Sequence, residues 1–358
     1  DDPDLGLTIG KASIVKLQTG EWAAVFGNGY NSETHRAMLF VVNLETGEII
    51  RKYDTNVGTP SQPNGLGTPT VADTEGLFGG TLAADSKGNF AYAGDLYGNM
   101  WRFDLSTSAP PVRLFTATDA NGRAQPIVSA PAVQAYAGPV ISGNRGLMVY
   151  FGTGRFFVVG DNEPKPTDPG HAFYGIRDLG NSSAVLRSQL VRQTINDNGV
   201  VRTTSENRVD YAAGQRGFWI DLSSGFTGER VLTSAVFRFG QVFFGTYAPL
   251  GGSCNPSSRG FIMSVSPFSG IGTLQALGVN VGSGGAGLYV QSSSPVPPTI
   301  LSTPRYLLAL TQINPGEPPP PPNPACQVNP NLPECVVRGA SKITIPRVSG
   351  RLSWKQLR

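Results

Sequence analysis

Short apolar runs recur along this chain, and each ends in an aromatic or small residue followed by glycine. A turn follows, and then a second apolar run that closes in Asp, Asn or Pro. β-branched and aromatic residues dominate the runs, whereas Gly, Asn, Asp and Ser dominate the joints, as pleated strands and tight turns require. The pattern therefore predicts pairs of short strands. The four clearest copies are 22–29 with 38–47, 90–99 with 100–105, 147–154 with 172–178, and 241–246 with 260–270.

A shorter strand with Ser/Thr-x-Pro or Ser-Ala is expected before such pairs, for example at 67–71, 129–133 and 233–236. A repeated antiparallel unit of three or four strands predicts an all-β fold, a modified β-propeller with quinoprotein-like repeats. Four blades are clear, and further degenerate blades are expected within 185–230 and 271–313. We therefore expect about seven blades, roughly six to eight. The polar, weakly patterned segment 187–211 is interpreted as a loop or an irregular blade.

Towards its C-terminal end the sequence becomes rich in proline and loses the repeated strand pattern. The pattern predicts three parts: a propeller over 1–313, a Pro-rich linker over 314–325 and a tail over 326–358. The linker reads as polyproline II, which is semi-rigid and extended. Within the tail, 341–348 alternates as a strand, and we expect it and Trp354 to dock on the propeller, because an isolated strand is not stable.

The tail also holds two cysteines nine positions apart, Cys326 and Cys335, in a loop rich in Pro and Asn. This spacing favours a local disulfide, which places the protein in an oxidising compartment. Two free thiols are the alternative. Cys254 is then either buried and free or paired with a cysteine outside this sequence.

Composition and charge further limit the possible fold classes and partners of the protein. The 45 Gly and 29 Pro residues make up about a fifth of the 358 residues, and only 15% are charged, which excludes coiled coils and helical bundles. A net charge of +3 without runs of like charge argues against a nucleic-acid partner. No apolar stretch is long enough to span a membrane. The opening Asp1-Asp2-Pro3-Asp4, without Met, is typical of a mature product or an excised fragment.

Several longer motifs resemble, in order along nearly the whole chain, the C-terminal propeller of the PilY/PilC family, tip-associated factors of type IV pili. The most specific is Tyr92-Ala93-Gly94-Asp95-Leu96-Tyr97-Gly98-Asn99-Met100-Trp101-Arg102-Phe103-Asp104-Leu105. Other segments that carry the resemblance are 26–32 with 41–47, 125–133, 150–155, 217–222 with 228–231, Cys254 with Arg259-Gly260, and 351–354.

The resemblance implies a modified β-propeller without enzymatic activity, exported through the periplasm to the cell surface at the fimbrial tip. It implies a pilus assembly factor and tip adhesin that scaffolds minor pilins, promotes pilus extension and twitching motility, and mediates adhesion to host or abiotic surfaces. Aromatic residues at hairpin tips, together with the tail tryptophan, are the expected partner contacts, with packing between blades as the alternative. These candidates are Tyr30, Tyr97, Tyr247 and Trp354.

Calcium is the one cofactor that the resemblance suggests, because family members often carry an EF-hand-like loop before the Tyr-Ala-Gly-Asp strand. Such loops need oxygen ligands at positions 1, 3 and 5 and Gly at 6. Here Lys87 stands at position 3, Gly88 comes early, and 77–84 separates the upstream carboxylates. A calcium site and a plain polar turn therefore both stay open. The candidate ligands are Asp73, Glu75, Asp85 and Asn89.

The rival function is a propeller enzyme, such as a quinoprotein dehydrogenase, or a propeller that binds or hydrolyses glycans. No two cysteines are adjacent, as they often are in the dehydrogenases. The only two histidines, His35 and His171, are both interpreted as solvated loop residues. Neither a three-histidine metal site nor a Ser-His-Asp triad is supported.

Overall fold

The computed structural model describes residues 2–78, 84–138, 144–250, 258–274, 282–291, 299–302, 306–310 and 343–346, the last three ranges by their backbone alone. Nearly all regular structure in these ranges is β. The one helix there is the 3-10 turn Arg187–Gln189 (η1), and no helix among the described residues is long and apolar enough to cross a membrane.

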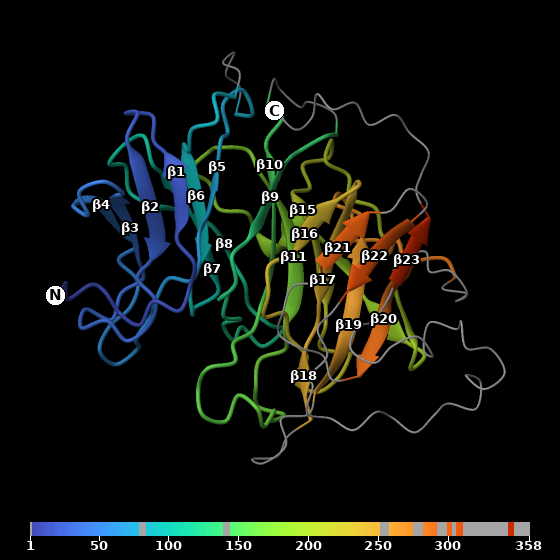
Figure 1. Ribbon diagram of the computed structural model, residues 1–358. Helices are drawn as coiled ribbons and strands as arrows, with labels where there is room; N and C mark the ends of the chain where they lie inside the picture. The colour runs from blue at the N-terminus through green and yellow to red at the C-terminus, as the bar shows by residue number, and fades with distance from the viewer. Residues whose placement is uncertain are drawn as a thin grey trace.

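The described strands form five sheets, which Figure 1 shows in succession from the blue first sheet to the orange and red fifth. The first is β1 (Ser13–Lys16), β2 (Trp22–Gly27), β3 (Met38–Asn43) and β4 (Ile49–Asp54). The second is β5 (Thr70–Ala72), β6 (Phe90–Gly94), β7 (Asn99–Asp104) and β8 (Val112–Thr116). Both have the order of the sequence, as expected for blades built from consecutive hairpins.

The other three sheets are larger or less regular. The third has the order β12 (Leu190–Gln193), β15 (Gly217–Asp221), β11 (Ala172–Asp178), β10 (Leu147–Gly152), β9 (Ala132–Ala135). The fourth has the order β13 (Ile195–Asp197), β14 (Val201–Thr204), β20 (Gly285–Gln291), β19 (Ser258–Val265), β17 (Gln241–Gly245), β16 (Val236–Arg238), with β18 (Ala248–Pro249) on β19. The fifth is β21 (Thr299–Ser302), β22 (Tyr306–Leu310) and β23 (Ile343–Pro346).

The four predicted strand pairs are confirmed as β2–β3, β6–β7, β10–β11 and β17–β19. The shorter preceding strands are present as β5, β9 and β16. In space β1 contacts β5, β5 contacts β9, and β9 contacts β16. These first strands of successive sheets therefore follow one another, as the inner strands of propeller blades do.

The segment 187–211, interpreted as a loop or an irregular blade, instead supplies strands to two sheets. β12 joins the third sheet as a parallel partner of β15, and β13 and β14 extend the fourth sheet beyond β20. The region 185–230 therefore adds strands to two neighbouring sheets and forms no separate blade. With five sheets in the described residues, the expected count of about seven blades is not confirmed.

β23 lies within 341–348 and pairs with β22. The other predictions for the C-terminal part concern the linker 314–325, the pair Cys326 and Cys335, and Trp354. All of these, and Cys254, lie outside the described residues.

A buried polar side chain follows the glycine at the end of the second strand in each of the first four sheets. Its oxygen accepts a hydrogen bond from a backbone N–H of the next strand, which satisfies a donor that would otherwise be buried without a partner. The four bonds join Asn28 to Met38 at 3.1 Å, Asp95 to Asn99 at 2.9 Å, Thr153 to Ala172 at 2.9 Å, and Thr246 to Phe261 at 2.9 Å.

The preceding glycine lets the next sheet approach. A Cβ atom on Gly94 would lie 2.2 Å from Cγ2 of Ile127, and one on Gly152 would lie 2.2 Å from Cβ of Val231. Ile127 and Val231 lie just before β9 and β16, so a side chain at either glycine would push two sheets apart. Glycine is required here because the backbones approach closely.

Asp95 is the most heavily bonded of the four polar residues. Its carboxylate accepts from the backbone N–H groups of Tyr97 and Asn99 and from the side chains of Asn64, Asn99 and Trp101, all at 2.9–3.0 Å. We expect Asp95→Ala to lower the free energy of unfolding by about 3–5 kcal/mol, because it leaves several buried donors without an acceptor. Urea unfolding followed by fluorescence measures this.

The matched control is Asp54→Ala. Asp54 pairs with Arg36 at 2.5 Å, and both side chains are partly exposed. Since exposed ion pairs contribute little, we expect a change below about 1 kcal/mol. Equal urea midpoints for the two variants would contradict the role assigned to Asp95.

Candidate functional site

A cavity of about 500 Å³ lies where successive sheets begin. Its lining includes the end of β2 at Phe26 and Gly27, the Leu66–Thr68 segment before β5, Val128 before β9, and Leu232 before β16. Four sheets thus contribute to one space, and this volume is typical of a small-ligand or side-chain pocket.

Two other segments complete the wall. Residues 8–12 line one part, and Phe156 and Phe157 from the loop between β10 and β11 line another. Phe157 stacks on Tyr30 with ring centroids 4.5 Å apart and an interplanar angle of 23°. Burial raises the pKa of Tyr30, so its hydroxyl stays protonated at neutral pH.

The chemistry of the cavity wall is that of a binding surface. Among the described residues that line it, the ionisable side chains are Lys11 and Tyr30, and none is Asp, Glu, His or Cys. These four residue types are among the commonest acids, bases and nucleophiles of active sites. The cavity can accept an apolar group, because most of the side chains that line it are apolar.

Two of the predicted contact tyrosines are buried. Tyr30 is 8% exposed and Tyr247 is 5% exposed. Tyr247 packs edge-on against Phe156 with ring centroids 5.0 Å apart. Tyr97 is partly exposed, and its hydroxyl donates to the carbonyl of Gln62. Packing, the alternative interpretation, therefore describes Tyr30 and Tyr247, and Tyr97 keeps some accessible surface.

The carboxylates proposed for calcium do come together. One oxygen each from Asp73, Glu75 and Asp85 lies within 4.8 Å of the others, because the loop after β5 meets the loop before β6. Residues 77–84 separate these groups in sequence but not in space. The Oδ1 of Asn89 accepts at 2.7 Å from the backbone N–H of Thr74, which lies between two of the three carboxylates in sequence.

Lys87 supplies a positive charge to this cluster. Its Nζ lies 2.7 Å from Oδ2 of Asp85, and the hydrogen bond from Lys87 lowers the pKa of Asp85. The cluster therefore holds three carboxylates and one ammonium group, and a bound divalent cation has to compete with that ammonium.

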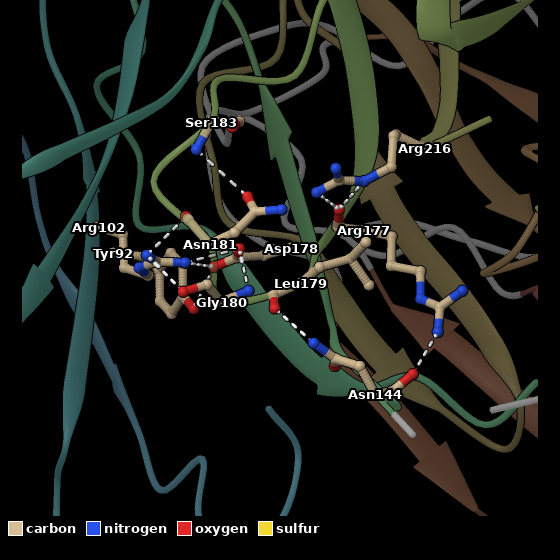
Figure 2. Close-up of polar contacts among 10 residues, drawn as sticks. All are labelled: Tyr92, Arg102, Asn144, Arg177, Asp178, Leu179, Gly180, Asn181, Ser183 and Arg216. Atoms are coloured by element: carbon tan, nitrogen blue, oxygen red, sulfur yellow. Dashed lines mark hydrogen bonds and ion pairs between the residues drawn. The ribbon is translucent and has the colours of Figure 1, made fainter. Parts of the chain in front are cut away.

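A buried ion pair joins the second and third sheets. Figure 2 shows Arg102 of β7 and Tyr92 of β6 converging on Asp178 at the end of β11. Arg102 Nη1 lies 2.8 and 2.9 Å from the two carboxylate oxygens, and the Tyr92 hydroxyl donates at 2.8 Å. Arg102 Nη2 donates to the carbonyls of Gly180 and Asn181. With its oxygens occupied and no exposed surface, Asp178 serves structure and is closed to a substrate.

A second arginine braces the same strand end. Arg177 donates to the carbonyls of Asn144 and Arg145, and its guanidinium lies 3.9 Å from the ring centroid of Tyr136. Arg216 donates in turn to the carbonyl of Arg177 (Figure 2). These contacts join residues far apart in the chain, so no local sequence pattern predicts them.

The interpretation of His171 as a solvated loop residue is wrong, because it is only 6% exposed. Its Nδ1 lies 3.4 Å from the Thr153 hydroxyl. Burial, together with the charge of Arg230, lowers the pKa of His171 to about 3, so the ring is neutral in the folded protein. His35 is half-buried and adopts a φ of 57°.

Comparison with known proteins gives consistent matches. A family model described as the PilY1 β-propeller domain matches residues 2–206. A type IV pilus biogenesis factor PilY1 homolog of Xylella fastidiosa (strain Temecula1) is 33% identical over an alignment that covers 100% of the chain and 26% of that relative. Type IV pilus biogenesis factor PilY1 of Pseudomonas aeruginosa (strain PAO1) is 29% identical over 75% of the chain and 26% of its own length.

The crystal structure of the C-terminal domain of Pseudomonas aeruginosa PilY1 is similar in fold, with a TM-score of 0.71 and 25% sequence identity. The match covers 88% of the chain and 72% of that structure. The chain thus spans about a quarter of the length of the curated relatives it matches.

The buried His171 predicts a pH dependence. Its folded pKa lies below its ordinary value of 6.5, so the unfolded state takes up the proton first as the pH falls. The contribution of His171 is fully present well above pH 6.5 and is lost progressively as the pH falls from about 6.5 to about 3, at up to about 1.4 kcal/mol per pH unit. We expect His171→Gln to flatten the decline in unfolding free energy over this window. Urea titrations at several pH values measure it, and parallel curves for both proteins would contradict the prediction.

Proposed function

The chain belongs to the family of PilY1 β-propeller domains, and we propose that it is a non-enzymatic scaffold in type IV pilus biogenesis. The match of the family model over residues 2–206 carries the proposal. The resemblance inferred from the motifs and the expected all-β propeller fold are both confirmed by this match and by the similar solved structure. The names of the related proteins indicate the biological process, type IV pilus biogenesis.

The chemistry of the buried charges supports scaffolding over catalysis. Arg202 contacts Glu229 at 2.5 Å and Asp197 at 2.6 Å, as Arg102 contacts Asp178. These groups are held by partners, so they are not available to activate a substrate. A propeller enzyme, whether a quinoprotein dehydrogenase or a glycan hydrolase, needs reactive groups at an accessible site, and the cavity wall has no carboxylate or imidazole among its described residues.

The partners that fit this role are minor pilins at the pilus tip. The domain acts at the cell surface after export through the periplasm, and the scaffold promotes pilus extension, twitching motility and adhesion to host or abiotic surfaces. The resemblance of the motifs and the names of the relatives support these assignments.

Direct binding tests the proposal. We expect the purified chain to bind the soluble ectodomain of at least one minor pilin from the same organism with a Kd of about 1 μM, within the range of specific assembly contacts. Biolayer interferometry measures the affinity, with the major pilin ectodomain as the control. If neither the chain nor the full-length protein binds any minor pilin, the scaffolding function is wrong.

We propose calcium binding as a second property of the domain, because one oxygen each of Asp73, Glu75 and Asp85 lies within 4.8 Å of the others. Extracellular calcium modules bind with Kd values of about 10⁻⁴–10⁻³ M, and competition from Lys87 places this site at the weak end.

We expect about 10 mM CaCl₂ to raise the melting temperature by about 2 °C through mass action, and MgCl₂ to raise it less. Lys87→Met removes the competing ammonium and is expected to enlarge the shift. Asp73→Asn combined with Glu75→Gln is expected to abolish it. Differential scanning calorimetry measures all three, and a wild-type melting temperature that does not respond to calcium would leave the cluster as a plain polar turn.

A further inference from the structure

Residues 8–12 line the cavity, and their backbone N–H and C=O groups form no main-chain hydrogen bonds with the described residues. Leu7 forms a bridge with Tyr30, and β1 begins at Ser13. Across the described part of the chain, the five residues between them take no part in a main-chain hydrogen bond, and all five are exposed. Free N–H and C=O groups beside a sheet are where an extended peptide adds as a further strand.

The position of this segment is fixed by a close contact. A Cβ atom on Gly10 would lie 2.4 Å from Oγ1 of Thr68, so the backbone of Gly10 packs directly on the entry to β5. The unpaired segment is therefore anchored on the body of the protein at both ends and near its middle. An anchored edge loses less conformational entropy when a peptide binds to it.

An apolar loop tip lies next to the cavity, which Phe157 lines. Phe157 and Val158 are 41% and 43% exposed, and Val159 is fully exposed. Asp161 holds this tip in place, since its Oδ2 accepts from the backbone N–H groups of Phe157 and Val158 at 3.0 and 2.9 Å. Ile9, which also lines the cavity, is 68% exposed. Clustered apolar groups held in water in this way are typical of interaction sites.

Charge points to the kind of group that binds. Lys11 lines the cavity and, among the described residues, makes no ion pair or hydrogen bond. No carboxylate of the described residues lines the same wall. An acidic group of the ligand therefore complements Lys11, whereas a basic group is repelled.

We propose that this cavity and residues 8–12 form a docking site for an extended peptide segment of a partner protein. The segment pairs its main chain with residues 8–12, places one apolar side chain in the cavity between Ile9 and Phe157, and brings a carboxylate to Lys11. The proposal stands on the unpaired main chain, the cavity and the charge, so it holds whether or not the partner is a pilin.

Synthetic peptides test it against the full chain. The probes are fluorescein-labelled ten-residue peptides of alternating valine and threonine with a free C-terminal carboxylate and Phe, Trp, Leu or Val at the centre. We expect at least one to bind with a Kd of about 10–100 μM in fluorescence anisotropy. Its binding is expected to slow hydrogen exchange at the amides of residues 8–12.

N-methylated peptides separate main-chain pairing from apolar contact. Methyl groups on alternate amides of one edge are expected to weaken binding by at least about tenfold, and methyl groups on the other edge are not. Equal effects of both peptides, or binding without protection of residues 8–12, would mark an apolar ligand pocket and overturn the proposal. A panel in which no peptide binds up to about 1 mM would overturn it as well.

Two charge reversals give a matched comparison. Lys11→Glu is expected to weaken binding about tenfold, whereas Lys16→Glu, an exposed lysine of β1 that does not line the cavity, is expected to leave it unchanged. Both sites are exposed, so both variants are expected to keep the wild-type melting temperature. Equal affinities of the two variants would exclude the assigned role of Lys11.

Discussion

The blade junctions depend on one polar side chain that follows the glycine at the end of a strand. The side-chain oxygen of Asn28 accepts from the backbone N–H of Met38 in its own sheet and from that of Leu66 at the start of the next. Asp95 and Thr153 bond their own sheet through the side chain, and their main-chain carbonyls accept from Ile127 and Val231 of the next sheet. Asn28 uses a side-chain amide, Asp95 a carboxylate and Thr153 a hydroxyl. Three different groups therefore make the same bond to the next strand of their own sheet. Since a buried donor without a partner costs about 1–3 kcal/mol, this residue fixes the strand pair and its neighbour together.

The glycine and the polar residue act as a unit. The glycine allows the entry strand of the next sheet to pack against the backbone, as Ile127 does at Gly94, and the polar residue then bonds the strand it faces. The ion pair between Arg102 and Asp178 is a further contact that joins the second sheet to the third. Breaking such a pair leaves a buried charge without a partner, so these contacts specify which sheet packs on which.

The cavity is a consequence of the same arrangement. Because the entry segments converge where the sheets begin, Leu66, Val128 and Leu232 meet around one space. The wall is apolar where the backbones enter, and it carries a cation only where the outer segment contributes Lys11. Such a space suits the binding of an apolar side chain, which agrees with the proposed role in contacts with other proteins.

The sequence by itself determined the strand pairs and the fold class, because apolar runs that end in glycine are local patterns that recur along the chain. The sequence also offered Asp73, Glu75 and Asp85 as candidate calcium ligands, although only the folded chain brought their oxygens within 4.8 Å of one another. Tertiary structure alone decided that β13 and β14 extend the fourth sheet, that His171 is buried, and that residues 8–12 border a cavity. The reason is that these features depend on partners far away in the sequence. A local pattern records which residues suit a strand, whereas packing decides which strand lies beside it.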